Sequence, residues 1–275
     1  MKKLLIVLFS LFLLVGCAGN NNNPTPNENP DKSGNEDTPK THLDAIKAQG
    51  YFTIGTEGEW APWTYEDATG TLVGYDVEVG KAIAEKLGVE ARFIENPWDG
   101  LLIGLETGKF DIVINGVDIT EERSQKFNFS VPYAYSEVAL IVAKDNEDIN
   151  SLEDLNGKTF ANSAGSSYEA LGESYGATNN TIDTFTDTMS MIEQGRVDAT
   201  INSYETYMDY MSTHPESNTK LVAVVNALDT AIPFVKGDYD ASFLQAVNDA
   251  IEDLRADGTL AEISNKYFGK DISVK

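Results

Sequence analysis

An arginine and a pair of serines carry the side chains best suited to binding an anion. Arg123 follows a predicted strand and begins a predicted helix beside Glu121 and Glu122. Its planar guanidinium can donate two parallel hydrogen bonds to a carboxylate. Ser166 and Ser167 begin another predicted helix, where free N–H groups and the helix dipole favour an anion. A surface ion pair for the arginine and simple helix capping by the serines remain open alternatives.

Histidine and cysteine are too scarce for the commonest catalytic and metal sites. The only cysteine is Cys17, and the only histidines are His42 and His214. A single cysteine can form neither an intramolecular disulfide nor a metal-binding cysteine cluster, and sites built on several histidines are disfavoured. We therefore expect no catalytic residues, no metal and no cofactor.

The balance of charges excludes another large class of function. The chain of 275 residues has 44 acidic and 20 basic side chains, which gives a formal net charge of −24. Nucleic-acid binding requires clustered lysine and arginine, so we expect no nucleic-acid partner. Hydrophobic residues make up 41% of the sequence, which is enough to form folded cores.

The first residues have the features of a secretion signal. Lys2 and Lys3 precede an almost unbroken apolar run of eleven residues, 4–14. A helix of that length rises about 16 Å, which is too short for a hydrocarbon core of ~30 Å, so a signal peptide is favoured over a membrane span. The run ends in LVGC, which resembles the lipobox of bacterial lipoproteins. This motif implies a signal peptide at 1–16 and a lipid on Cys17, and an ordinary signal with a chance cysteine is the alternative.

A polar segment follows the cysteine. Residues 17–42 contain four consecutive asparagines and four prolines among Asp, Glu and Gly. Such a composition cannot bury a core and predicts a flexible tether. The tether would hold the folded part of the chain away from a membrane.

The remaining sequence alternates short β-rich runs with helical patterns, which predicts an α/β fold. Strands are expected at 51–56, 91–94, 110–115, 158–162, 197–202 and 220–225. Helices are expected at 76–87, 98–107, 166–175, 186–194, 204–211, 241–255 and 259–267. Residues 151–154 (SLED) have the spacing of a helix capping box. Two successive sets of strands and helices indicate two lobes with a cleft between them.

Ordered segments between about residues 43 and 270 resemble the extracellular solute-binding proteins of family 3, which serve polar amino acid ABC transporters. The matching segments are 55–63 (GTEGEWAPW), 74–79 (GYDVEV), 98–101 (WDGL), 108–111 (GKFD), 119–123 (ITEER), 129–133 (FSVPY), 195–199 (GRVDA) and 256–260 (ADGTL). Because so many segments occur in the same order as in the family, the resemblance is specific.

The resemblance implies a two-lobed α/β fold of the type II periplasmic-binding-protein kind, with a hinge of two crossover strands. By analogy, lobe 1 covers 43–137 plus 231–275 and lobe 2 covers 138–230. The implied function is capture of one amino acid for ABC permease subunits. The implied location is the extracytoplasmic face of a cell membrane, with Cys17 as the lipid anchor, as on a Gram-positive surface. We expect a monomer.

The resemblance also assigns roles to individual residues. The arginine that matches Arg123 binds the ligand carboxylate from lobe 1. The turn that matches Ser166 and Ser167 binds the same carboxylate from lobe 2, and the neighbouring Tyr168 could contact the ligand side chain.

Three further positions match the part of the family site that surrounds the ligand side chain. Trp60 and Trp98 stand where the family places rings or apolar groups, although Trp98 could equally belong to the core. Glu57 matches a position that reaches polar or cationic ends of the ligand side chain.

The chain departs from the family pattern at two positions. Ser203 stands where lobe 2 usually carries the aspartate that binds the ligand ammonium, and Asp118 stands where lobe 1 usually carries Ser or Thr. An ammonium in a closed cleft needs an anionic or multiply hydrogen-bonded partner. We therefore expect Asp118 to supply the carboxylate, with Asn115 and the backbone of Gly116 as neutral acceptors. Glu205 or a water molecule is the alternative partner.

The ligand itself is left open between several amino acids. Residues 55–58 (GTEG), 115–117 (NGV) and 202–203 (NS) resemble a subgroup that includes cystine binders. Cystine is therefore the first candidate, followed by polar and basic amino acids.

Two other kinds of protein compete with a transport component. Cyclohexadienyl dehydratases have this fold, and Glu57, Asp118 or Glu173 could in principle act as an acid or base. A solute sensor that works without a permease is the other alternative.

Overall fold

The computed structural model describes residues 40–275. The expected signal peptide, Cys17 and residues 17–39 of the expected tether lie outside the described residues. No helix in the described part of the chain is both long enough and apolar enough to cross a membrane.

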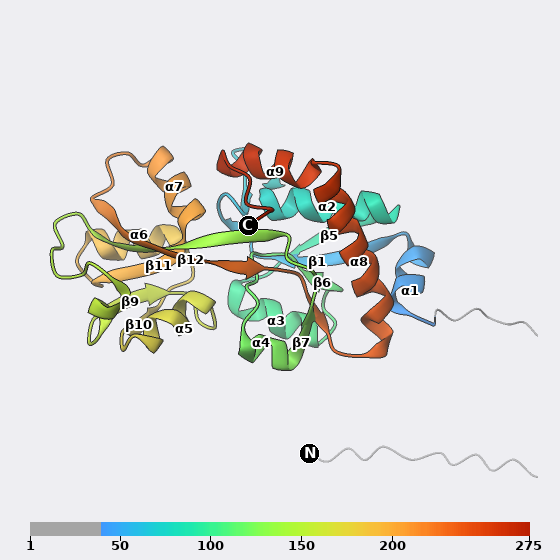
Figure 1. The fold of residues 1–275 in the computed structure, drawn as a ribbon, viewed down its shortest axis with the longest axis horizontal. Helices are drawn as coiled ribbons and strands as arrows, with labels where there is room; N and C mark the ends of the chain where they lie inside the picture. The colour runs from blue at the N-terminus through green and yellow to red at the C-terminus, as the bar shows by residue number, and fades with distance from the viewer. Residues whose placement is uncertain (1–39) are drawn as a thin grey trace, which may run out of the picture. The chain divides into compact units, whose positions relative to one another are not determined.

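Lobe 1 is built on a parallel three-stranded sheet in the order β5-β1-β6 (Figure 1). Its strands are β1 (Tyr51–Thr56), β5 (Glu90–Glu95) and β6 (Ile112–Val113). One small sheet consists of β2 (Glu59–Trp60), β3 (Thr64–Glu66) and β4 (Leu72–Val73). A second small sheet pairs β7 (Phe127–Phe129) with β13 (Pro233–Val235). The helices of this lobe are α1 (His42–Gln49), α2 (Tyr75–Leu87), α3 (Trp98–Glu106), α4 (Glu121–Lys126), α8 (Asp238–Ala256) and α9 (Thr259–Phe268).

Lobe 2 contains the five-stranded sheet in the order β10-β9-β11-β8-β12. These strands are β8 (Ala134–Ala143), β9 (Thr159–Asn162), β10 (Thr178–Thr181), β11 (Ala199–Ser203) and β12 (Thr219–Thr230). The accompanying helices are α5 (Ser167–Ser174), α6 (Phe185–Glu193), α7 (Tyr204–Thr213) and the short 3-10 helix η1 (Leu152–Leu155).

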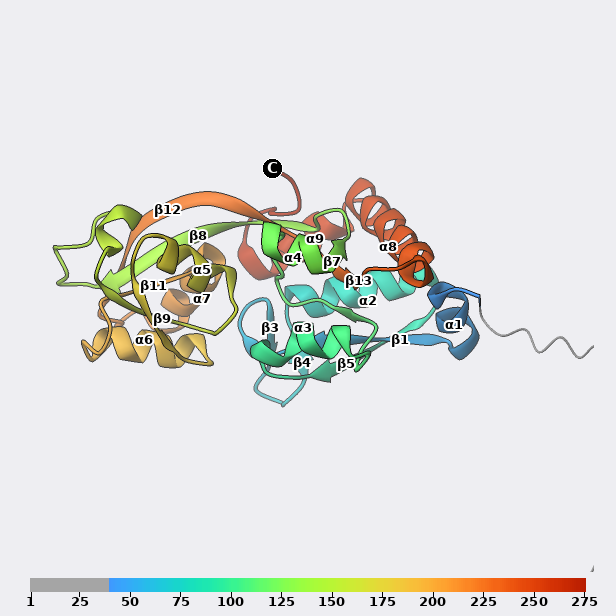
Figure 2. The ribbon, with the colours of Figure 1, turned by 90° about the horizontal axis from the view of Figure 1, so that it is seen from below.

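Two long strands connect the lobes. β8 and β12 are antiparallel and run from one lobe into the other (Figures 1 and 2). Their pairing extends from Ala134 opposite Thr230 to Ala143 opposite Thr219, with two register shifts along the way. Because both strands cross together, the chain forms a two-stranded hinge, as the expected fold requires.

Most expected helices and strands are present, with bounds that differ by a few residues. The strand expected at 110–115 is reduced to β6, and the strand at 220–225 is part of the longer β12. The local pattern did not predict strand β8, although the resemblance implies a crossover strand near residue 137. Both its faces are largely buried, so its sequence lacks the alternation of a half-exposed strand. The capping box forms at Ser151 and Asp154, and it opens the 3-10 helix η1.

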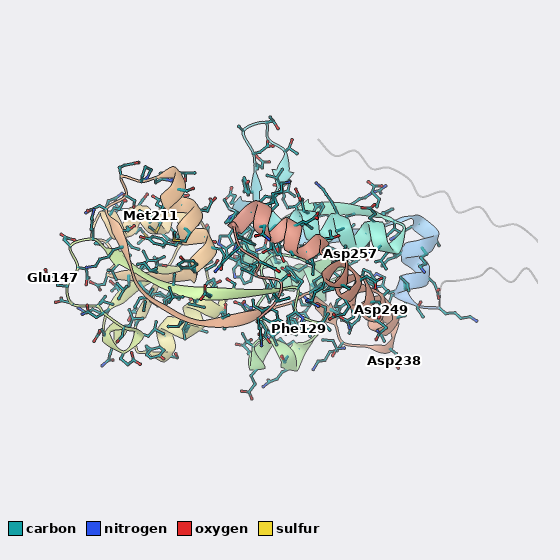
Figure 3. The ribbon with its side chains drawn as sticks, turned by 45° about the horizontal axis from the view of Figure 1, so that its top comes forward. Phe129, Glu147, Met211, Asp238, Asp249 and Asp257 are labelled. Atoms are coloured by element: carbon teal, nitrogen blue, oxygen red, sulfur yellow. The ribbon has the colours of Figure 1, made fainter. Side chains whose placement is uncertain are left out.

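The acidic residues lie largely on the outside. Asp238, Asp249 and Asp257, at the ends and on the outer face of α8, are exposed (Figure 3). Solvated carboxylates of this kind keep a protein soluble and do not define a ligand site.

A half-buried histidine joins α1 to the rest of lobe 1. His42 lies between two carboxylates, with Nε2 2.8 Å from Asp111 Oδ1 and Nδ1 against Asp240. Its ring stacks on Tyr239 at 5.2 Å. Burial opposes the charged ring, but the hydrogen bonds and charges of the two aspartates outweigh burial and raise the pKa of His42.

This arrangement predicts a pH-dependent contribution to stability. A raised folded-state pKa means that the contribution is complete below about pH 6 and disappears as the pH rises through the folded-state value. We expect His42→Gln to lower the unfolding free energy by about 2 kcal/mol at pH 5.5 and by much less at pH 9, as measured by thermal denaturation. His214→Gln serves as the control, and an equal loss at both pH values would contradict the interpretation.

Candidate functional site

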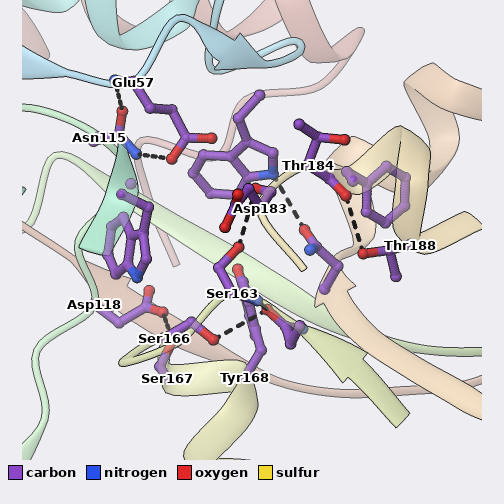
Figure 4. A pocket seen from close by; sticks show the side chains of 16 residues that line it. Glu57, Asn115, Asp118, Ser163, Ser166, Ser167, Tyr168, Asp183, Thr184 and Thr188 are labelled. Atoms are coloured by element: carbon purple, nitrogen blue, oxygen red, sulfur yellow. Dashed lines mark hydrogen bonds between the residues drawn. The ribbon is translucent and has the colours of Figure 1, made fainter. Parts of the chain in front are cut away.

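A cavity of about 490 Å³, counting the part open to solvent, lies between the lobes (Figure 4). Nine of the eleven expected ligand-binding residues line it, namely Glu57, Trp60, Trp98, Asn115, Gly116, Asp118, Ser166, Ser167 and Tyr168. Arg123 and Ser203 do not line it. Seven further residues complete the lining, namely Asn162, Ser163, Asp183, Thr184, Phe185, Thr188 and Asn202.

The end of β1 positions the first carboxylate. Asn115 Oδ1 accepts hydrogen bonds from the backbone N–H of Glu57, at 2.8 Å, and from Thr56 Oγ1, at 3.0 Å. The Asn115 amide in turn donates to Glu57 Oε2 at 3.0 Å. Asn115 therefore holds both the backbone and the side chain of Glu57 in place.

The indole of Trp60 forms one wall and reaches across the cleft. Gly116 has φ +55°, and a Cβ atom there would lie 2.4 Å from the Trp60 ring, so only glycine lets the ring lie this close to the backbone. Trp60 Nε1 donates to Asn202 Oδ1 of lobe 2 at 3.2 Å. The ring also stacks on Trp63 at 5.3 Å. Trp60 is thus part of both the cavity wall and the contact between lobes.

Asp118 is a buried carboxylate at the base of the cavity. Its Oδ2 accepts a hydrogen bond from Ser167 Oγ of lobe 2 at 2.5 Å, and Thr230 Oγ1 donates to its Oδ1 at 3.3 Å. Burial raises the pKa of Asp118 to about 6, although the Ser167 hydrogen bond and the charge of Arg123 oppose this rise. Asp118 therefore lies where both lobes can share a bound group.

The cavity carries negative charge without a basic side chain in its lining. Among the described residues that line it, Glu57, Asp118 and Asp183 are acidic and none is lysine or arginine. Burial raises the pKa of Glu57 to about 7, against the lowering effect of the Asn115 hydrogen bond. A cationic group in the cavity would stabilise the ionised form of these acids.

The start of α5 supplies polar groups from lobe 2. Ser166 is the N-cap of this helix, and its hydroxyl accepts from the backbone N–H of Glu169 and donates to Asn162 Oδ1 at 3.0 Å. Helix capping and anion binding are compatible at these serines, because Ser166 caps the helix while Ser167 faces the cavity. The positive end of the helix dipole points towards this wall.

Arg123 lies directly behind the cavity. Its guanidinium donates to the backbone oxygen of Asp118 at 2.9 Å and to that of Gly165 in lobe 2 at 3.1 Å. It also lies 5.4 Å from the ring of Trp98. The alternative of a surface ion pair with Glu121 or Glu122 does not describe this side chain, because Arg123 is buried and bridges the lobes.

Ser203 and Glu205 point away from the cavity. Ser203 Oγ accepts from Trp63 Nε1 at 3.2 Å and donates to Glu205 Oε2 at 2.9 Å. Ser203 is the N-cap of α7. Glu205, the alternative partner for a ligand ammonium, does not line the cavity.

Sequence reasoning did not select the lobe 2 wall at 183–188. Asp183, Thr184, Phe185 and Thr188 come from the turn before α6 and from its first turns, where Thr184 is the N-cap. A threonine three residues before Asp187 is a recognisable helix start. That pattern marks the helix but not the cavity, because only the packing of α6 against the lobe 2 sheet turns this start towards lobe 1.

The site thus combines features that suit a small zwitterion. Polar hydroxyls and a helix start face it from lobe 2, two carboxylates face it from lobe 1, and the rings of Trp60, Trp98 and Phe185 provide apolar surface. Apolar walls with a few convergent polar groups are typical of small-molecule sites.

Comparison with known proteins agrees with the fold. The L-cystine-binding protein TcyA of Bacillus subtilis (strain 168) is 37% identical over 278 residues, covering 99% of this chain and 100% of the relative. The L-cystine-binding protein TcyJ of Escherichia coli (strain K12) is 33% identical over 234 residues, covering 84% and 87%. A solved structure described as an ancestral arginine-binding protein bound to arginine has a TM-score of 0.75 and 35% identity, covering 80% of this chain and 99% of that one.

The model of a protein family also matches most of the described residues. It spans residues 52–270, which include both lobes and the two crossover strands. The chain therefore belongs to the bacterial extracellular solute-binding proteins, family 3.

Proposed function

We propose that this protein is the substrate-binding component of an amino acid ABC importer, and that its ligand is cystine or another amino acid with a polar or charged side chain. The observation that carries the proposal is the cavity between the lobes, to which both lobes contribute polar groups. The named ligands of the relatives, cystine and arginine, support the same class.

The chemistry of the cavity suggests how such a ligand would lie. Its carboxylate would face Ser166 and Ser167 at the start of α5. There the Arg123 guanidinium would replace one of its hydrogen bonds to backbone oxygens with a hydrogen bond to this carboxylate. Its ammonium would face Asp118, and its side chain would extend between the rings towards Glu57. Both cystine, with its second ammonium, and arginine, with its guanidinium, place a cationic group at that end.

Delivery of the ligand would depend on lobe closure. A ligand that touches both lobes stabilises the closed form because only that form offers all of its contacts. We propose that permease subunits recognise the closed form, and that a lipid on Cys17 keeps the monomeric protein at the extracytoplasmic face of the membrane.

A thermal-shift screen of the standard amino acids and cystine tests the function. A ligand at 100 times its dissociation constant adds about 2.7 kcal/mol to stability, which corresponds to a rise in Tm of about 5–10 °C for a domain of this size. We expect this rise for cystine or for a polar or basic amino acid. If no compound in the screen raises Tm, amino acid binding is not the function.

Asp118→Asn tests the proposed ammonium partner. Removing one member of a buried charge pair leaves the ammonium without a counter-charge, so we expect the affinity for the amino acid identified in the screen to fall about 30-fold or more, measured by calorimetry. Asp249→Asn, which removes an exposed charge on α8, is the matched control. Unchanged affinity in Asp118→Asn, together with loss of binding in Ser203→Ala, would place the ammonium partner in lobe 2.

The raised pKa of Glu57 predicts a pH dependence of binding. Below about pH 7 this carboxyl is mostly protonated and must release its proton to face a cationic group. The affinity for a ligand with a cationic side-chain end should therefore fall about tenfold or more between pH 7.5 and pH 5.5. In Glu57→Gln this change should become smaller, and an unchanged pH profile would show that Glu57 does not face the cationic end.

A further inference from the structure

A buried carboxylate joins the lobes outside the lining of the ligand cavity. Glu205 lies in the first turn of α7, and its side chain is 1% exposed. Its Oε1 lies 2.9 Å from the ammonium of Lys270, which follows α9 in lobe 1. In Figure 1, α7 and α9 lie on one side of the crossover strands, and α4 and α5 lie on the other.

The second oxygen of Glu205 connects three parts of the molecule. Oε2 accepts hydrogen bonds from Ser136 Oγ of the crossover strand β8, at 2.8 Å, and from Ser203 Oγ of lobe 2, at 2.9 Å. Ser203 in turn accepts from Trp63 Nε1 of lobe 1 at 3.2 Å. The Glu205 carboxylate therefore contacts residues of lobe 1, lobe 2 and the hinge.

Lys270 is held on the lobe 1 side of this contact. Its backbone oxygen accepts from Ser264 Oγ of α9 at 2.7 Å. Its ammonium also lies 2.8 Å from Glu137 Oε2 of β8 and 4.8 Å from the ring of Tyr204 in α7. A shift of lobe 2 away from lobe 1 would have to stretch the contacts with Tyr204 and Glu205.

The surfaces around this ion pair are not tightly packed. A groove of about 770 Å³, counting the part open to solvent, lies between α7 and the end of α9. It is lined by Met208, Asp209, Tyr267 and Phe268 together with the ion pair itself. The ion pair therefore lies beside a groove that opens to solvent. Neither Lys270 nor Glu205 lines the ligand cavity.

We propose that Lys270 and Glu205 form a latch that favours lobe closure independently of the ligand. In the closed arrangement the Glu205 carboxylate is withdrawn from water and depends on Lys270 for its counter-charge. When the lobes separate, both groups can be hydrated, so the ion pair matters more to the closed form than to the open one. The ion pair therefore determines how much of the free energy of lobe closure the ligand has to supply.

The distance between the lobes in the ligand-free protein tests this latch. The full chain with Cys17→Ser offers a cysteine-free background, in which the exposed positions Ala68→Cys of lobe 1 and Asn180→Cys of lobe 2 carry spin labels. We expect Lys270→Met to shift the measured distance distribution towards longer separations. Lys266→Met is the matched control, because Lys266 of α9 pairs with Glu78 within lobe 1.

Glu205→Gln provides the second variant, because it removes the charge and keeps the shape of the side chain. It should shift the distances in the same direction as Lys270→Met, and the double variant should shift them no further than the larger single effect. Distances equal to those of the parent protein in both single variants, with normal folding in at least one, would overturn the latch.

Affinity gives a second measure, which rests on the proposed function. For the amino acid identified in the screen we expect Lys270→Met to raise Kd about tenfold, mainly through faster dissociation, while Lys266→Met leaves it unchanged. If no amino acid binds, the proposed function fails but the ligand-free distances still test the latch. If Lys270→Met binds the amino acid as the parent does and its distances are also unchanged, the latch fails and the proposed function stands.

Discussion

The paired crossover strands impose the constraint on which the rest of the structure depends. β8 and β12 belong to the lobe 2 sheet along most of their length, and both continue into lobe 1. Because they cross together, the lobes can rotate about one short region but cannot separate. Residues that face the cleft are thereby held near the opposite lobe, and the interactions between the lobes decide between open and closed forms.

Two groups of contacts bridge the cleft on either side of these strands. On the α4 and α5 side, Asp118 meets Ser167, and Arg123 meets the backbone of Gly165. On the α7 and α9 side, Lys270 meets Glu205. The first group includes lining residues of the ligand cavity, whereas neither Lys270 nor Glu205 lines it. The proposed latch would let lobe closure be adjusted by residues outside the cavity lining.

The charge distribution in the cavity explains why its acids are hard to ionise. The Arg123 guanidinium is directed towards backbone oxygens behind the lining, so Glu57 and Asp118 lose hydration without gaining an adjacent basic side chain in the lining. Their pKa values rise for that reason. A ligand that brings its own cationic group into the cavity compensates these carboxylates for their lost hydration. The acidic lining therefore favours ligands that carry a cationic group.

The sequence alone determined the local elements and the family. Helical patterns predicted α2, α3 and α9, and the segments around Trp60 and Arg123 predicted a two-lobed binding fold. These features depend on residues close together in the chain, so pattern and motif are sufficient to find them. The local pattern did not predict the buried strand β8, because burial on both faces removes the alternation of apolar and polar residues that marks a strand.

Only the tertiary structure decided which polar groups face the cavity. The resemblance predicts ligand contacts for Ser203 and Arg123, yet Ser203 turns to Trp63 and Glu205, and Arg123 lies behind Asp118. Asp183 and Thr188 enter the cavity although no motif marked them. The orientation of such side chains is set by partners more than 40 residues away in the chain, such as Asp118 for Ser167 and Lys270 for Glu205. Those partners come together only when the two lobes meet.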